Sequence, residues 1–156
     1  MWTVCAALLA GPAPADAESE RAEAVEKRAG VFRPEQLRHV DTADVWRMIL
    51  ERDTRGQALQ LVDLRIEADF AKGALPGAVN IPLKKMSFKA EAALNRTDPI
   101  VLYGYGSRDR SSINAAVLLA QKGYSNMSFY DDGYPGWVSN VVEGGSIPTG
   151  VDDAQT

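Results

Sequence analysis

The chain has 156 residues, of which 46% are hydrophobic and 24% are charged, and its formal net charge at pH 7 is -4. This length suits one domain with a single core. A mean hydropathy of -0.20 argues against a membrane span. The sequence pI near 5.0 argues against a general nucleic-acid binder, because phosphate binding needs a basic face.

Cysteine and histidine occur once each, as Cys5 and His39. One cysteine cannot form an internal disulfide, and one histidine cannot supply a histidine-rich metal cluster. Both residues lie outside the segments that we assign to the domain core, and we expect His39 to be a surface or packing residue. We therefore expect no metal and no cofactor. Thiol catalysis and a Ser-His-Asp triad both lack their residues.

The first 31 residues form two segments of different composition. Residues 1–17 contain a short apolar run at 4–10, then small residues and prolines, and residues 15–17 read A-x-A, as at a signal cleavage site. We expect an export signal or its remnant, and hence a periplasmic or secreted protein. The alternatives are a disordered tail and a cytoplasmic protein. Residues 18–31 are charged and alanine-rich, which favours a solvated linker.

From residue 32 onward, helix-type and strand-type patterns alternate. Asp41 is suited to cap a helix in which Val45, Met48 and Ile49 form the buried stripe. The patterns predict helices over 42–51, 67–72, 84–94 and 111–123 with a short last one ending at Val142, and strands over 59–65, 78–81, 100–103 and 126–130. Such alternation predicts an α/β domain with a mainly parallel sheet of about five strands and helices on both faces.

Asp63 and Arg65 end the first of these predicted strands. We interpret them as a structural salt bridge. The domain is expected to span residues 32–148, and residues 149–156 a flexible tail, since the sequence is polar from Gly144 onward.

The most informative stretch runs from Ile100 to Ser112, as IVLYGYGSRDRSS. An apolar run ends at Gly104, a polar loop follows, and a helix begins near Ser111. Backbone N–H groups and the helix dipole make such a turn an anion cradle, to which Arg108 and Arg110 add positive charge. Ligands of parallel sheets bind at the carboxyl ends of the strands, where this loop lies.

Several separated motifs together resemble a single rhodanese domain. They are the D-x-R strand end at 63–65, the turn GALPGAVNIP at 73–82, the apolar strand at 100–103, the Gly-Tyr pair at 123–124, and DGYPGW at 132–137. The resemblance implies a rhodanese-like α/β fold and sulfur transfer by a cysteine thiolate at the start of the active-site loop. That loop usually reads C-x-x-G-x-R-S.

This chain departs from the family pattern in three places. Gly104 stands at the cysteine position and has no side chain to carry sulfur. The loop from Gly104 to Arg110 is one residue longer than usual for sulfurtransferases and closer to that of the related cell-cycle dual-specificity phosphatases, which suits a phosphate-sized or arsenate-sized anion. Ala74 replaces a frequent histidine. All three departures point in the same direction: we expect the rhodanese-like scaffold to be kept and the catalytic residues to be absent.

The leading hypothesis is a catalytically inactive rhodanese-like domain that binds a partner protein or a small oxyanion. The expected binding loop comprises Gly104, Tyr105, Gly106, Ser107, Arg108, Asp109, Arg110 and Ser111. Tyr105, Tyr134 and Trp137 are candidates for its walls, although tryptophans such as Trp137 are more often part of the core. For the arginines, the alternative is a solvated loop with a salt bridge to Asp109 or Asp131.

The sequence leaves two other functions open. One is an enzyme that uses a hydroxyl of Tyr105, Ser107, Ser111 or Ser112, for which Asp109 would be a weak base because two arginines should hold its pKa low. The other is a purely structural or assembly domain whose loop has no ligand. Cys5 as a mobile nucleophile is the least favoured.

Overall fold

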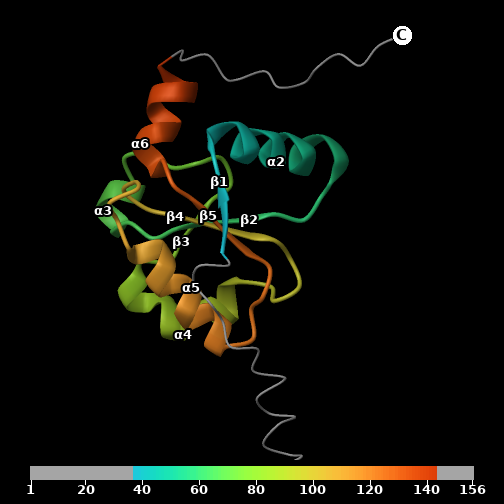
Figure 1. Cartoon of the computed structure of the whole chain (residues 1–156), viewed down its shortest axis with the longest axis vertical. Helices are drawn as coiled ribbons and strands as arrows, with labels where there is room; N and C mark the ends of the chain where they lie inside the picture. The colour runs from blue at the N-terminus through green and yellow to red at the C-terminus, as the bar shows by residue number, and fades with distance from the viewer. Residues whose placement is uncertain (1–36, 144–156) are drawn as a thin grey trace, which may run out of the picture. The chain divides into compact units, whose positions relative to one another are not determined.

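A computed structural model describes residues 37–143 of the chain, and Figure 1 shows their arrangement. Five strands are present in this part: β1 Arg38–Val40, β2 Gln60–Asp63, β3 Val79–Asn80, β4 Ile100–Tyr103 and β5 Met127–Tyr130. The α-helices are α2 Thr42–Arg55, α3 Glu67–Phe70, α4 Met86–Ala93, α5 Ser111–Gln121 and α6 Gly133–Trp137. A 3-10 turn, Leu83–Lys85, precedes α4, and a π-helical turn, Val138–Val142, follows α6.

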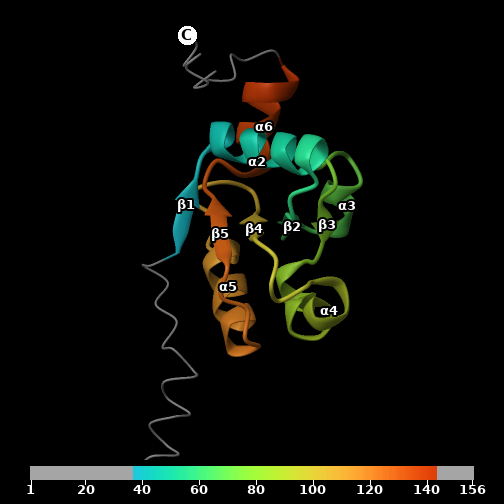
Figure 2. The same ribbon diagram turned by 90° about the vertical axis from the view of Figure 1, so that its right-hand side faces the viewer.

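All strands pair in parallel, in the order β1-β5-β4-β2-β3. The strand β4 is central, and its Leu102 lies between Val62 of β2 and Phe129 of β5. Figure 2 shows the sheet between two helical layers, with α2 and α6 on one face and α4 and α5 on the other. The predicted α/β class, with a parallel five-stranded sheet and helices on both faces, is therefore confirmed.

The alternation of side chains along β4 divides the core into two clusters. Ile100 and Leu102 pack with Met86 and Ala90 of α4 and with Leu119 of α5. On the other face, Val101 and Tyr103 pack with residues of α2 and α6, namely Val45, Ile49 and Trp137. All four residues of β4 are buried, which explains why its sequence is a continuous apolar run.

Most predicted elements are confirmed with shifted ends. The Asp41 side chain accepts a hydrogen bond from the N–H of Asp44, as expected for the cap of α2. That helix continues past the predicted end at Glu51 and stops at Gly56, whose φ of 67° is the left-handed conformation that glycine favours. The predicted helix 84–94 is a 3-10 turn followed by α4, and β1 was not predicted.

The predicted signal segment (1–17), the charged linker (18–31) and the flexible tail (149–156) all lie outside the described residues. Among the described residues, no helix is long and apolar enough to cross a membrane. The same part of the chain contains no group of three or more metal-ligating side chains that could hold an ion.

Candidate functional site: the loop after β4

The loop between β4 and α5 lies at the carboxyl edge of the central strand and is closed by the carboxylate of Asp109. Its Oδ2 accepts hydrogen bonds from the backbone N–H of Tyr105 at 3.1 Å and from the Ser111 hydroxyl at 2.6 Å. Its Oδ1 accepts the N–H of Ser111 at 2.9 Å. Three donors of the predicted anion cradle are thus already bonded to a carboxylate of the loop itself.

This carboxylate also fills the space beside Gly104. A Cβ added to Gly104 would overlap Asp109 Oδ2 and lie 2.8 Å from Ser111 Oγ. Partial burial alone would raise the pKa of Asp109. Hydrogen bonds from Ser111 and from the N–H of Tyr105 outweigh burial and leave that pKa below its usual value. The direction agrees with the prediction, but its cause is these hydrogen bonds and not the two arginines.

Arg108 and Arg110 are both exposed. Within residues 37–143 neither forms an ion pair, so the alternative of a salt bridge to Asp109 or Asp131 is not observed there. Asp131 pairs instead with His39, whose Nδ1 lies 2.7 Å from Asp131 Oδ2 and whose ring contacts Phe129. The expected surface and packing role of His39 is confirmed.

Tyr105 is held on the surface by two hydrogen bonds, although 48% of it is exposed. Its hydroxyl donates to Asp69 Oδ2 at 2.7 Å and accepts the N–H of Ile66 at 3.4 Å. The hydrogen bond to Asp69 raises the pKa of Tyr105, so the phenol is neutral at neutral pH. Ile66 is also an exposed apolar residue.

The other side of the loop contacts the start of α6. The N–H of Tyr134 donates to the carbonyl of Gly104 at 3.0 Å. A hollow of about 410 Å³ lies between the two segments. It is lined by Tyr105, Gly106, Ser107, Arg108, Asp132, Gly136 and Asn140. Three residues of the predicted binding loop other than Tyr105 therefore border one cavity. They are joined by residues from Asp132 to Asn140, which were not predicted as site residues.

Two of the proposed wall residues belong elsewhere. Trp137 is buried in the core next to Trp46, with ring centroids 5.8 Å apart. The ring of Tyr134 lies against the guanidinium of Arg65, 3.9 Å from its centroid. Neither side chain lines the hollow beside the loop, so Tyr105 alone of the three predicted wall residues is confirmed in that position.

The Asp63–Arg65 pair supports the base of this region. Arg65 Nη2 lies 2.6 Å from Asp63 Oδ2, and both side chains are almost fully buried. Arg65 also donates to the carbonyl of Gly73 at 2.7 Å. Burial lowers the pKa of Arg65, but the hydrogen bond and the charge of Asp63 outweigh burial and raise it above its usual value. The predicted structural salt bridge is confirmed.

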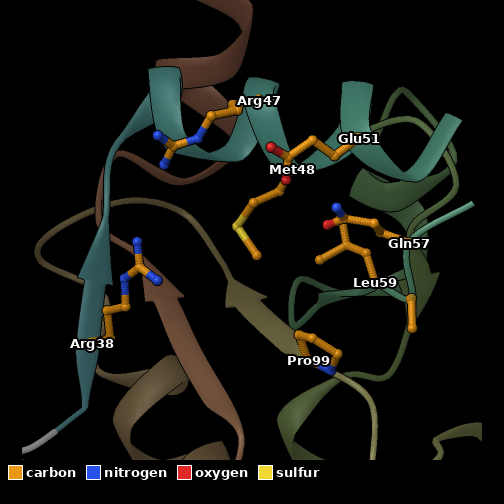
Figure 3. A pocket seen from close by; sticks show the side chains of 8 residues that line it. Arg38, Arg47, Met48, Glu51, Gln57, Leu59 and Pro99 are labelled. Atoms are coloured by element: carbon orange, nitrogen blue, oxygen red, sulfur yellow. The ribbon is translucent and has the colours of Figure 1, made fainter. Parts of the chain in front are cut away.

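A second hollow, of about 310 Å³, lies at the opposite edge of the sheet, where the strands begin. Figure 3 shows Arg38 of β1 facing Arg47, Met48 and Glu51 of α2, with Leu59 and Pro99 below them. The sequence gives no signal for this hollow, because its residues come from separate segments: the stretch before Asp41, the predicted helix 42–51, the start of the predicted strand 59–65 and the turn at Pro99.

Comparison with known proteins places these features in a family. The family model described as "Rhodanese-like domain" matches residues 42–140, from the start of α2 into the π-helical turn that follows α6. A curated relative, thiosulfate sulfurtransferase GlpE of Shewanella oneidensis, is 31% identical over 85 residues, which are 54% of this chain and 80% of that protein.

Solved structures give the same result. The Alr3790 protein from Anabaena sp. is 25% identical, with a TM-score of 0.54, over 64% of this chain and 76% of that chain. A rhodanese-like domain protein from Staphylococcus aureus is 18% identical, with a TM-score of 0.55, over 65% and 91% respectively. At this low identity, the similarity to the Staphylococcus aureus protein shows a shared fold and nothing more.

The parallel sheet, its two helical layers and the strand-loop-helix at β4 define an α/β domain with a polar loop at the carboxyl edge of its central strand. With the family match covering more than half of the sequence, the chain belongs to the rhodanese-like domain family.

Proposed function

We propose that this domain does not transfer sulfur through its loop and instead binds a protein partner that presents acidic groups. One observation carries the first half: Gly104 directly follows β4, where the family resemblance places the sulfur-carrying cysteine. A thiolate is required to attack a sulfane sulfur and hold it as a persulfide. Glycine cannot do this, although the relative from Shewanella oneidensis is named a thiosulfate sulfurtransferase.

The second half rests on the exposed residues of the loop. Tyr105 is oriented by Asp69 and Ile66, and its ring remains half exposed. Tyrosine and arginine are the residue types that most often carry binding energy at protein interfaces. Because Tyr105 is already fixed, ordering its side chain on binding costs little conformational entropy.

Charge indicates the kind of partner. Arg108 and Arg110 are exposed and form no ion pair within residues 37–143, so both are available to carboxylates or other anionic groups. Guanidinium groups bind such oxygens through paired N–H donors. A small oxyanion would be attracted in the same way, but an acidic peptide would contact Tyr105 as well.

The test is a titration with defined probes. Fluorescence anisotropy would follow a labelled hexaglutamate peptide, and calorimetry would follow sulfate and thiosulfate, all at low salt with the full chain. We expect the peptide to bind, with affinity reduced about tenfold or more by Arg108→Ala combined with Arg110→Ala, and reduced further by added salt.

Arg38→Ala combined with Arg55→Ala is the matched control, because it removes two exposed positive charges at positions outside the loop. Equal losses of peptide affinity in the control and in the loop variant would contradict the proposal. Peptide affinity that does not change when the loop arginines are replaced would also contradict it. Thiocyanate formation from thiosulfate and cyanide by the unmodified chain would contradict the claim of inactivity.

A further inference from the structure

Besides the glycine at position 104, the loop has a second unusual feature, which is the inward position of the Asp109 carboxylate. Three donors in the loop point at its carboxylate: the N–H groups of Tyr105 and Ser111, and the Ser111 hydroxyl. A negatively charged sulfur attached at position 104 would need stabilisation by donors of this kind, because a thiolate is favoured by nearby N–H groups and by a helix N-terminus. In this chain the same donors bind the carboxylate of Asp109, five residues downstream of Gly104.

The overlap is steric as well as electrostatic. A Cβ on Gly104 would clash with Asp109 Oδ2, and Ser111 Oγ would lie 2.8 Å from it. The obstacle is a side chain, so it can move. Moving it breaks three hydrogen bonds and turns a carboxylate with a lowered pKa out of its partly buried position. If the carboxylate stays, it faces the new sulfur at close range, and two like charges disfavour each other.

We propose that Asp109 is a second, independent block on sulfur chemistry, so that Gly104→Cys alone does not give a working sulfurtransferase loop, whereas Gly104→Cys combined with Asp109→Ala does. The inference rests on the proposed function only for the absence of a nucleophile at position 104. It does not depend on the acidic partner, so failure of the peptide titration would leave it standing.

The reaction to be restored has two balanced steps. The introduced thiolate attacks the outer sulfur of thiosulfate; the new S–S bond forms as the old one breaks, and sulfite leaves with the electron pair. Cyanide then attacks the outer sulfur of the persulfide, which yields thiocyanate and regenerates the thiolate. Both steps begin and end with an anion at position 104, where the Asp109 carboxylate now takes the available donors.

The experiment compares three variants of the full chain: Gly104→Cys, Gly104→Cys with Asp109→Ala, and Gly104→Cys with Asp131→Ala. The last is the matched control, since it removes a nearby carboxylate that bonds to His39 and makes no contact with the loop donors. Cys5 is replaced by serine in all three, so that one thiol is present. Circular dichroism and urea unfolding establish that each variant is folded.

Two readouts are measured. The first is the initial rate of thiocyanate formation from thiosulfate and cyanide. We expect Gly104→Cys and the Asp131 control to be within about twofold of the unmodified chain, and the Asp109 double variant to be at least about tenfold faster. Equal rates for all three variants, clearly above that of the unmodified chain, would overturn the proposal.

The second readout is the pH dependence of alkylation by iodoacetamide, which reports the pKa of the introduced thiol without requiring turnover. Removing Asp109 should shift the alkylation midpoint to lower pH by about one unit relative to Gly104→Cys, because the freed N–H groups then stabilise the thiolate. Two outcomes besides equal rates overturn the proposal: no thiocyanate formation by the folded Asp109 double variant, and identical alkylation profiles with and without Asp109.

Discussion

The backbone N–H of Tyr134 donates a hydrogen bond to the carbonyl oxygen of Gly104 at 3.0 Å, which fixes the start of α6 against the loop that follows β4. Gly133 makes this approach possible. Its φ is +59°, and a Cβ there would lie 2.5 Å from the same carbonyl oxygen and 2.6 Å from the N of Gly106. The obstructing atoms are backbone atoms, so they cannot rotate away as a side chain would.

Gly133→Ala should therefore lower the free energy of unfolding by about 2–4 kcal/mol, of which about 1 kcal/mol comes from the left-handed conformation and the rest from overlap. Urea unfolding monitored by tryptophan fluorescence measures the change. Gly56→Ala is the control, because its φ of +67° is similar but nothing lies within 4 Å of its added Cβ. Equal losses for the two variants would show that packing against the loop contributes nothing.

Arg65→Ala should destabilise the domain more than the loss of any exposed ion pair. It leaves the Asp63 carboxylate, which has a relative exposure of 0%, without its partner and also breaks the hydrogen bond to the Gly73 carbonyl. An unpaired buried charge costs about 3–5 kcal/mol, whereas exposed pairs contribute about 1 kcal/mol or less. Arg47→Ala, which breaks the exposed pair with Asp44, is the comparison in the same urea experiment. Similar losses for both would contradict the assignment.

Asp109→Asn should change the response of the domain to acid. The pKa of Asp109 is lowered in the folded state, so the carboxylate adds stability that is complete above the unfolded-state pKa of about 3.9. This contribution is lost as the pH falls through the lower pKa of the folded state. The free energies of unfolding of the unmodified chain and of Asp109→Asn should therefore differ at pH 7, by about 1 kcal/mol, and converge in strong acid. A difference that does not change with pH would contradict the charge-dependent hydrogen bonds of Asp109.

The sequence predicted the elements that rest on contiguous apolar patterns. All four residues of β4 are buried, and its predicted bounds match the structure because a central parallel strand has no exposed face to interrupt the run. The strand β1 was missed for the opposite reason. Arg38 and His39 are exposed and only Val40 is buried, so three residues at the sheet edge carry no apolar periodicity.

The candidate site was predicted only in part. The loop was correctly placed at the carboxyl edge of β4 from its glycines, its arginines and the helix that follows. The inward position of Asp109 was not predicted, because it depends on the backbone path that brings the N–H groups of Tyr105 and Ser111 to one carboxylate. From the sequence, Asp109 is one residue of the expected binding loop, and an ion pair with the neighbouring arginines is only an alternative. No sequence pattern encodes the geometry that turns its carboxylate toward the loop donors.

A further prediction concerns the loss of stability at alkaline pH, which depends on the buried hydroxyl of Tyr130. Its hydroxyl lies 2.6 Å from Thr42 Oγ1 in the interior, and burial raises its pKa to about 12 against the opposing effect of that hydrogen bond. An unfolded tyrosine ionises near pH 10. Between about pH 10 and pH 12 the folded state therefore holds a proton that the unfolded state has lost, and stability falls as the pH rises.

Tyr130→Phe removes this titration while keeping the ring. The free energy of unfolding of the variant should decline less steeply between about pH 10 and pH 12 than that of the unmodified chain, with the slopes differing by about one proton. Tyr103, whose pKa is also raised by burial and by the charge of Asp63, remains in both proteins, so the difference isolates Tyr130. Urea unfolding at a series of pH values measures the slopes, and ultraviolet difference spectra follow the phenols. Parallel slopes would mean that Tyr130 ionises in the folded protein as readily as in the unfolded chain. That result would contradict the raised pKa of the buried Tyr130 hydroxyl.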